Sequence, residues 1–233
     1  MKTILTLIPC LLLAAGCAQR GAMGGGESIP MHSETSSRGS NIAKSAECQL
    51  YSQMRKLWSD HVIWTREYIV AAVDGSPGAD AVSKRLMKNQ EDIGQAIGQF
   101  YGTPSGEQLT RLLKEHISIA ADIVADAKGD DQPKFRTDND RWLNNAKQIA
   151  GFLSRANPHW PKSTMEDMMS KHLKTTADEL DAHLKKQHRE DVEAFDAVYD
   201  HILQMSDALS EGIIKQFPEK LTYKLIAGGT RQR

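Results

Sequence analysis

Residues 109–120 have the sequence LTRLLKEHISIA, and their pattern is found along most of this chain. The apolar residues recur at intervals of three and four, as they do on the buried stripe of an α-helix. His116 falls on that stripe and not on the solvated side. The stretch therefore predicts a helix that carries one imidazole in its buried face.

Similar helical stripes each carry one polar residue. The six residues are spaced by 28, 27, 29, 27 and 29 positions: His61, Asn89, His116, Asn145, His172 and His201. Sequences typical of turns lie about midway between them, at 74–77, 101–104, 128–131, 157–161 and 185–189. At about 1.5 Å per residue, each polar residue then lies ~20 Å from either end of its helix. The spacing predicts a layer of four imidazoles and two amides (the His/Asn layer) halfway along an antiparallel bundle.

The pattern of polar and apolar residues also repeats at an offset of 56 residues. The pairs at this offset include Asn89 with Asn145, Ile93 with Ile149, His116 with His172, and Asn145 with His201. Matched flanking residues indicate a tandem repeat of helical pairs. We therefore expect an all-α fold, namely an up-and-down antiparallel six-helix bundle built from three tandem helical hairpins, over residues 46–218.

Small residues indicate one close contact within that bundle. Gly94, Gly98 and Gly102 recur at every fourth position, which predicts a smooth helix face against a neighbouring helix. Each glycine in a helix interior costs about 1 kcal/mol relative to alanine, so a packing role explains their presence better than chance does.

The N-terminus predicts where the protein is located. Lys2 precedes a short apolar run, and the ending LLAAGC at residues 12–17 resembles a bacterial lipobox. We expect residues 1–16 to be a lipoprotein signal peptide and Cys17 to carry the lipid that binds the membrane. Gln19 favours the outer membrane, so the chain is expected in the bacterial cell envelope, facing the periplasm. Residues 17–45, rich in glycine and serine, predict a flexible tether, and 219–233 a C-terminal tail.

Composition excludes several function classes. The formal net charge of −1 and the absence of a basic stripe give no indication of a nucleic-acid partner. Cys10 would be removed with the signal peptide and Cys17 lipidated, so Cys48 has no partner for an intramolecular disulfide. We expect Cys48 to be a partly buried thiol. A protein partner cannot be identified from these residues.

Two explanations account for four imidazoles in one apolar layer. They could hydrogen-bond with the amides of the layer, or they could bind a transition metal. In the metal reading, His61, His116, His172 and His201 are ligands, and Asn89, Asn145 and Asp92 orient them. Neutral imidazole favours copper or zinc, and iron or nickel are possible ions. The carboxylate spacing of a di-iron bundle is absent, as are a paired-histidine zinc-protease motif and a phosphate-binding glycine loop.

Three longer strings resemble a bacterial family of small helical proteins. They are LWSDHVIWTREYI at 57–69, NQEDIGQAIGQFYG at 89–102 and HILQMSDALSEGIIKQFP at 201–218. The resemblance covers about residues 50–220, and its most specific part is the LWxxHVxWTR opening. Members of that family often carry the labels glycosyltransferase or acetylglutamate kinase. Those activities normally need alternating strands and phosphate loops, which this sequence lacks, so the resemblance implies an all-α fold and no catalytic residues.

Three functions fit these observations. The first is a lipid-anchored, periplasm-facing bundle that binds a transition metal or small polar ligand through the His/Asn layer. The second is a structural or partner-binding module in which that layer is a core hydrogen-bond network. The third is an enzyme that uses His–Asn–Asp acid/base chemistry, which requires an accessible, water-filled cavity at the layer. We expect binding or structural function more than catalysis.

Overall fold

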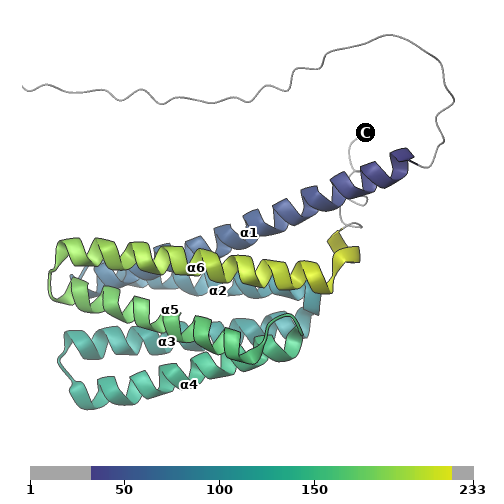
Figure 1. Cartoon of the computed structure of the whole chain (residues 1–233). Coiled ribbons are helices and arrows are strands. Elements are labelled where there is room, and N and C mark those ends of the chain that lie inside the picture. Colours follow the sequence, from purple (N-terminus) through teal and green to yellow (C-terminus); the bar gives the residue numbers. More distant parts are fainter. Residues whose placement is uncertain (1–32, 222–233) are drawn as a thin grey trace, which may run out of the picture.

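The structure is a computed structural model that describes residues 33–221 (Figure 1). This part of the chain is all-helical and contains no strand, which confirms the predicted all-α class. A final helical turn at 218–221 follows the last long helix. The six long helices are α1 (Ser33–Val73), α2 (Ala79–Tyr101), α3 (Thr103–Lys128), α4 (Gln132–Ala156), α5 (Lys162–Leu184) and α6 (His188–Gln216).

Each helix packs on the next one along the chain, and α6 also packs on α1. α1 makes further contacts with α3 and α5, so it borders most of the other helices. Figure 1 shows the helices side by side, with short connections at both ends and α1 extending beyond the others at its N-terminal end. The arrangement is compatible with the predicted six-helix bundle.

The glycines of α2 and α3 allow the closest contact between helices. A Cβ atom on Gly94 would lie 2.6 Å from the carbonyl oxygen of Gly106, and one on Gly106 would lie 3.0 Å from the Cα of Gly98. The predicted packing role of Gly94 is therefore confirmed. Gly98 lies in the same contact, but a Cβ there would lie at an ordinary 3.6 Å from the Cα of Gly106, so this position has room for a side-chain carbon. For Gly102 that prediction is wrong, because Gly102 is the single residue between α2 and α3 and has a positive φ of 88°. A residue without a Cβ adopts this conformation readily.

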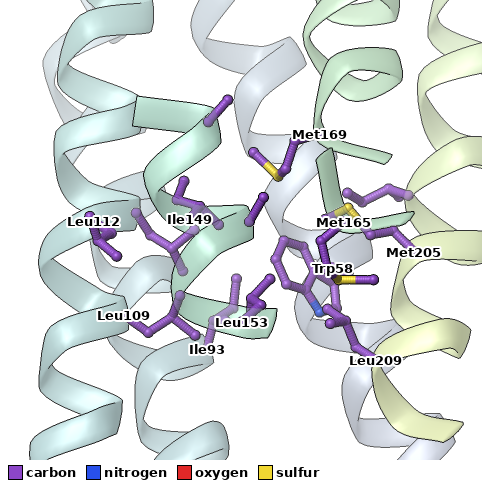
Figure 2. Packing of buried hydrophobic residues seen from close by; sticks show 14 of the residues in the cluster. Trp58, Ile93, Leu109, Leu112, Ile149, Leu153, Met165, Met169, Met205 and Leu209 are labelled. Atoms are coloured by element: carbon purple, nitrogen blue, oxygen red, sulfur yellow. The ribbon is translucent and has the colours of Figure 1, made fainter. Parts of the chain in front are cut away.

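The core consists of aliphatic side chains, methionines and tryptophans from all six helices. Figure 2 shows the Trp58 ring of α1 between Ile149 and Leu153 on one side and Met165 and Met205 on the other. These side chains are buried, so the middle of the bundle is closely packed.

Two predicted boundaries differ from the structure. α1 begins at Ser33, inside the segment 17–45 for which the sequence predicts a tether. An established helix can extend outward because each added residue gains a hydrogen bond without needing a new nucleus. At the other end, Leu221 is buried, so the packed domain continues past residue 218. Cys48, expected to be partly buried, is exposed. The predicted signal peptide, the lipid site Cys17 and residues 222–233 lie outside the described residues.

Candidate functional site

The structure brings the four predicted histidines together in the middle of the bundle. His172 is the central one: its ring centroid lies 5.6 Å from that of His61, 6.1 Å from that of His116 and 6.4 Å from that of His201. All four side chains are buried, as are Asn89 and Asn145. The six residues come from six different helices. All but His61, which is closer to the C-terminal end of the long helix α1, lie near the middle of their own helix.

On α3 and α4, the layer is held by an amide. Asn145 donates from Nδ2 to the carbonyl oxygen of Leu112 (3.1 Å), and its Oδ1 lies 2.8 Å from Nδ1 of His116. An amide oxygen only accepts, so His116 donates from Nδ1 and its Nε2 is unprotonated in the neutral ring. Asn145 therefore fixes both the orientation and the tautomer of His116.

On α1 and α2, a glutamine lies between the amide and the imidazole. Asn89 donates from Nδ2 to the carbonyl oxygen of Leu57 (3.0 Å). Nε2 of Gln90 lies 3.2 Å from Oδ1 of Asn89 and 3.2 Å from Nδ1 of His61. His61 accepts at Nδ1, since the amide nitrogen is a donor. Gln90 was not predicted, because it is one position away from Asn89 and therefore about 100° around the helix from it.

On α5 and α6, an imidazole replaces the amide. His201 donates from Nε2 to the carbonyl oxygen of Met168 (2.9 Å). In all three helix pairs the acceptor is the carbonyl four residues before a histidine: Leu57 before His61, Leu112 before His116, and Met168 before His172. A helix carbonyl has a second lone pair, so it accepts this bond in addition to its own helical one.

Two tryptophans complete the layer. The ring of Trp142 stacks on His116 with centroids 5.2 Å apart, and Trp58 meets His61 edge to face at 5.7 Å. Both indoles are buried. Trp58 lies one turn before His61 on the same face of α1, so their contact follows from the spacing in the sequence. Trp142 and His116 belong to different helices, so only the tertiary structure brings them together.

Burial keeps the imidazoles neutral. It lowers the pKa of His61 to about 3 and that of His116 to about 4, because the interior disfavours a charged ring. Burial also lowers the pKa of His172 and of His201, and for His172 the three neighbouring imidazoles add to the effect. At neutral pH the layer is therefore an uncharged group of donors and acceptors.

The layer is closed to anything larger than water. A cavity beside it offers about 20 Å³ to the centres of water molecules, and His61, His116 and His172 line it together with apolar side chains. One water needs roughly 10–15 Å³ by this measure. Within residues 33–221, Nε2 of His116, Nδ1 of His172 and Nδ1 of His201 have no protein hydrogen-bond partner. The cavity is therefore large enough for one water molecule, but its surface is almost entirely apolar.

The predicted metal ligands do not constitute a preformed metal site within residues 33–221. In the described part of the chain, no three histidine, cysteine, aspartate or glutamate side chains are grouped so that they could hold a metal ion. Asp92, predicted to orient the ligands, forms an ion pair with Lys88 one turn away on the outer face of α2. Three residues correspond to about 300°, so Asp92 lies about 60° around the helix from Asn89, and it pairs with Lys88 at the partly exposed side of α2.

A second polar cluster was missed by sequence reasoning. Arg66 of α1 donates from NH1 to Glu179 of α5 and to Asp191 of α6, at 2.8 Å in each case. Nδ1 of His183 lies 3.0 Å from Oδ2 of Asp191. Burial raises the pKa of Glu179 to about 7 despite the nearby guanidinium. Burial alone would also raise the pKa of Asp191, but hydrogen bonds from Arg66 and His183 hold it below its usual value. The cluster joins α1 to the consecutive helices α5 and α6, and Arg66 is 113 positions from Glu179 and 125 positions from Asp191 in the sequence.

Comparison of the chain with protein-family models, curated proteins and solved structures gives no match. The resemblance to the LWxxHVxWTR family therefore stays a prediction from the sequence. Among the described helices, none combines the length and apolar character that a bilayer crossing requires.

Proposed function

We propose that this chain is a lipid-anchored, periplasm-facing helical module of the bacterial cell envelope, structural or partner-binding in role. Its His/Asn layer acts as a core hydrogen-bond network that fixes the register of three tandem helical hairpins in an up-and-down six-helix bundle. The observation that carries this proposal is the same bond in three helix pairs, from Asn89, Asn145 and His201 to a carbonyl four residues before a histidine.

The physical reason is that polar core residues penalise wrong packing. Sliding one helix by a turn past its partner would leave an amide and a carbonyl buried without partners, at about 1–3 kcal/mol for each group. Aliphatic contacts discriminate much less between registers, and a single buried polar residue is known to specify register in coiled coils. The layer thus makes one arrangement of these helices preferable to its neighbours.

The network is tested by replacing Asn145 with leucine and measuring urea unfolding. We expect Asn145→Leu to lose about 2–3 kcal/mol of unfolding free energy, because it removes the partners of His116 and of the Leu112 carbonyl. Asn144 is exposed on the same helix, so Asn144→Leu is the matched control and should change stability by less than about 0.5 kcal/mol. Equal stability of the two variants would refute a structural role for the layer.

The membrane anchor is tested separately. The lipobox-like ending at Cys17 supports lipid attachment, and several acyl chains anchor a protein stably. We expect wild-type protein expressed in a bacterium to incorporate labelled palmitate and to fractionate with the outer membrane. Cys17→Ser should lose the label, whereas Cys48→Ser should keep it. Label retained in Cys17→Ser would refute the lipid site.

A transition metal at the His/Asn layer is the second candidate. It is supported by the unpaired ring nitrogens of His116, His172 and His201 and by the neutral state of the imidazoles, the form that binds metals. Copper and zinc suit these ligands best. Elemental analysis of protein purified without affinity metal would show near-stoichiometric metal that His172→Ala abolishes. Metal-free protein that gains no thermal stability from added copper or zinc would refute this candidate.

Catalysis at the layer has less support. The cavity of about 20 Å³ leaves no space for a substrate beside the imidazoles, and Asp92 does not face them. Acid/base chemistry by a His–Asn–Asp group would need space for a substrate and a carboxylate that faces the imidazoles.

A further inference from the structure

A larger pocket lies between the His/Asn layer and one end of the bundle. It has a volume of about 340 Å³ and is bordered by residues of α1, α2, α3, α4 and α5. The pocket lies toward the end of the bundle that holds the turns at 74–78, 129–131 and 185–187. This end is on the left of Figure 1, opposite the end where α1 begins. Small-molecule sites typically measure ~300–1,000 Å³, so this pocket has the size of a site for a small ligand.

The pocket wall is mainly apolar, with two buried polar groups. Ile69, Ile117, Val124 and Leu180 are among the residues that form the wall. Trp142 and Thr176 also line it, and both side chains are more than nine-tenths buried. Within residues 33–221, neither Nε1 of Trp142 nor Oγ1 of Thr176 has a hydrogen-bond partner. Both atoms are enclosed by neighbouring protein atoms, so neither faces the pocket, and the surface that a ligand would contact is mainly apolar.

The charge at the pocket favours a neutral ligand. Asp181, on the exposed face of α5, is the one ionisable carboxylate among the lining residues, and no lysine or arginine lines the pocket in the described part of the chain. Asp181 is already paired with Lys185 at 2.7 Å. An anion would lose its hydration without gaining a cationic partner, and a cation would compete with Lys185.

We propose that this pocket binds a small, neutral, mainly apolar molecule, which its aliphatic and aromatic wall holds. The mouth lies between α4 and α5, where Gln132, Ala177 and Asp181 are exposed. This goes beyond the proposed structural role, since a bundle can keep its register whether or not the pocket is used. Trp142 connects the two sites, because it lines the pocket and stacks on His116.

The test uses acetophenone as the probe, with the full-length chain. Acetophenone is neutral, has an apolar ring and carries one carbonyl acceptor. We expect it to shift the indole N–H resonance of Trp142 saturably in NMR spectra, with the signal assigned from a Trp142→Phe variant. α-Methylstyrene has a methylene group in place of the carbonyl oxygen, and we expect it to bind within a few-fold of acetophenone, because the wall is mainly apolar. Benzoate, the anionic relative, should produce no saturable shift.

A matched pair of variants locates the site. Ala177→Trp places a large ring at the mouth and should abolish the saturable response to acetophenone. Ala125 is an exposed alanine of α3 outside the pocket, so Ala125→Trp should respond as the wild type does. Circular dichroism checks that both variants fold, and a rise of the melting temperature with acetophenone gives an independent readout. The proposal is overturned if the two variants respond alike, if Trp142 shows no saturable shift, if α-methylstyrene fails to bind, or if benzoate binds as tightly as acetophenone. None of these results depends on the stability of Asn145→Leu, so this proposal and the structural role can fail separately.

Discussion

Nε2 of His201 lies 2.9 Å from the carbonyl oxygen of Met168, and the bond takes the place of one that asparagine makes in the other two helix pairs. Imidazole and amide serve the same purpose because each offers one N–H donor at a comparable reach from the helix. The three bonds explain why asparagine or histidine recurs at intervals of 56 residues, at positions 89, 145 and 201.

The equivalence of the two donors can be tested at His201. Replacing His201 with asparagine should preserve the bond to Met168 and cost about 1 kcal/mol, whereas His201→Leu should cost about 2–3 kcal/mol because the Met168 carbonyl loses a buried donor. Urea unfolding of both variants measures the difference. If leucine is tolerated as well as asparagine, the donor at this position has no structural role.

Stability should fall as the pH is lowered below about 6.5. The pKa of His61 is about 3 and that of His116 about 4 in the folded protein, both below the ordinary value of 6.5. Between pH 6.5 and 4 the unfolded chain therefore binds more protons, so unfolding becomes easier as pH falls. Each such histidine contributes at most about 1.4 kcal/mol per pH unit. Glu179 opposes this between about pH 7 and 4.5, because its pKa is raised to about 7 in the folded state.

The pH effect is measured as the urea midpoint between pH 8 and pH 5. His116→Gln should make the dependence less steep by removing one titrating group from the layer, whereas Asn144→Gln on the exposed face of α4 removes no titrating group and should leave the slope unchanged. A wild-type midpoint that rises steadily toward pH 5 would contradict the neutral state of the buried imidazoles.

Two glycines of α2 should respond in opposite ways to alanine. A Cβ on Gly94 meets the Gly106 carbonyl at 2.6 Å, so Gly94→Ala should force α2 and α3 apart and cost about 1–3 kcal/mol. A Cβ on Gly98 meets the Cα of Gly106 at an ordinary 3.6 Å, so Gly98→Ala should stabilise the helix by about 0.5–1 kcal/mol. Thermal unfolding of the two variants gives the comparison, and destabilisation by both would mean that the helices are closer at Gly98 than described.

The Arg66 cluster should contribute far more to the free energy of unfolding than a surface ion pair does. Arg66→Met leaves the buried carboxyls of Glu179 and Asp191 without their cation and should cost about 3–5 kcal/mol. Arg55 pairs with Asp207 across α1 and α6 but is half-exposed, so Arg55→Met is the matched control and should cost less than about 1 kcal/mol. Urea unfolding at pH 7 measures both. Similar losses would indicate that the cluster is not effectively buried.

Much of the fold could be predicted from the sequence because the hydrogen bonds of a helix join residues that are close in the sequence. The stripe around His116 and the turn sequences at 74–77 and 157–161 predict helices whose bounds lie close to those observed. The common height of the four histidines also follows, since it depends only on helix length and the rise per residue. By contrast, the early start of α1 at Ser33 and the burial of Leu221 depend on extension and docking at the ends, where the apolar pattern is weak.

The sequence by itself determined which residues share a layer, through intervals of 27 to 29 residues between polar positions on buried stripes. Only the tertiary structure decided what those residues contact. The rotation of each helix about its axis turned Asp92 outward, brought Gln90 between Asn89 and His61, and joined Arg66 to Glu179 and Asp191. Spacing along a helix fixes height, but contacts across the bundle depend on how side chains from several helices fill the same space.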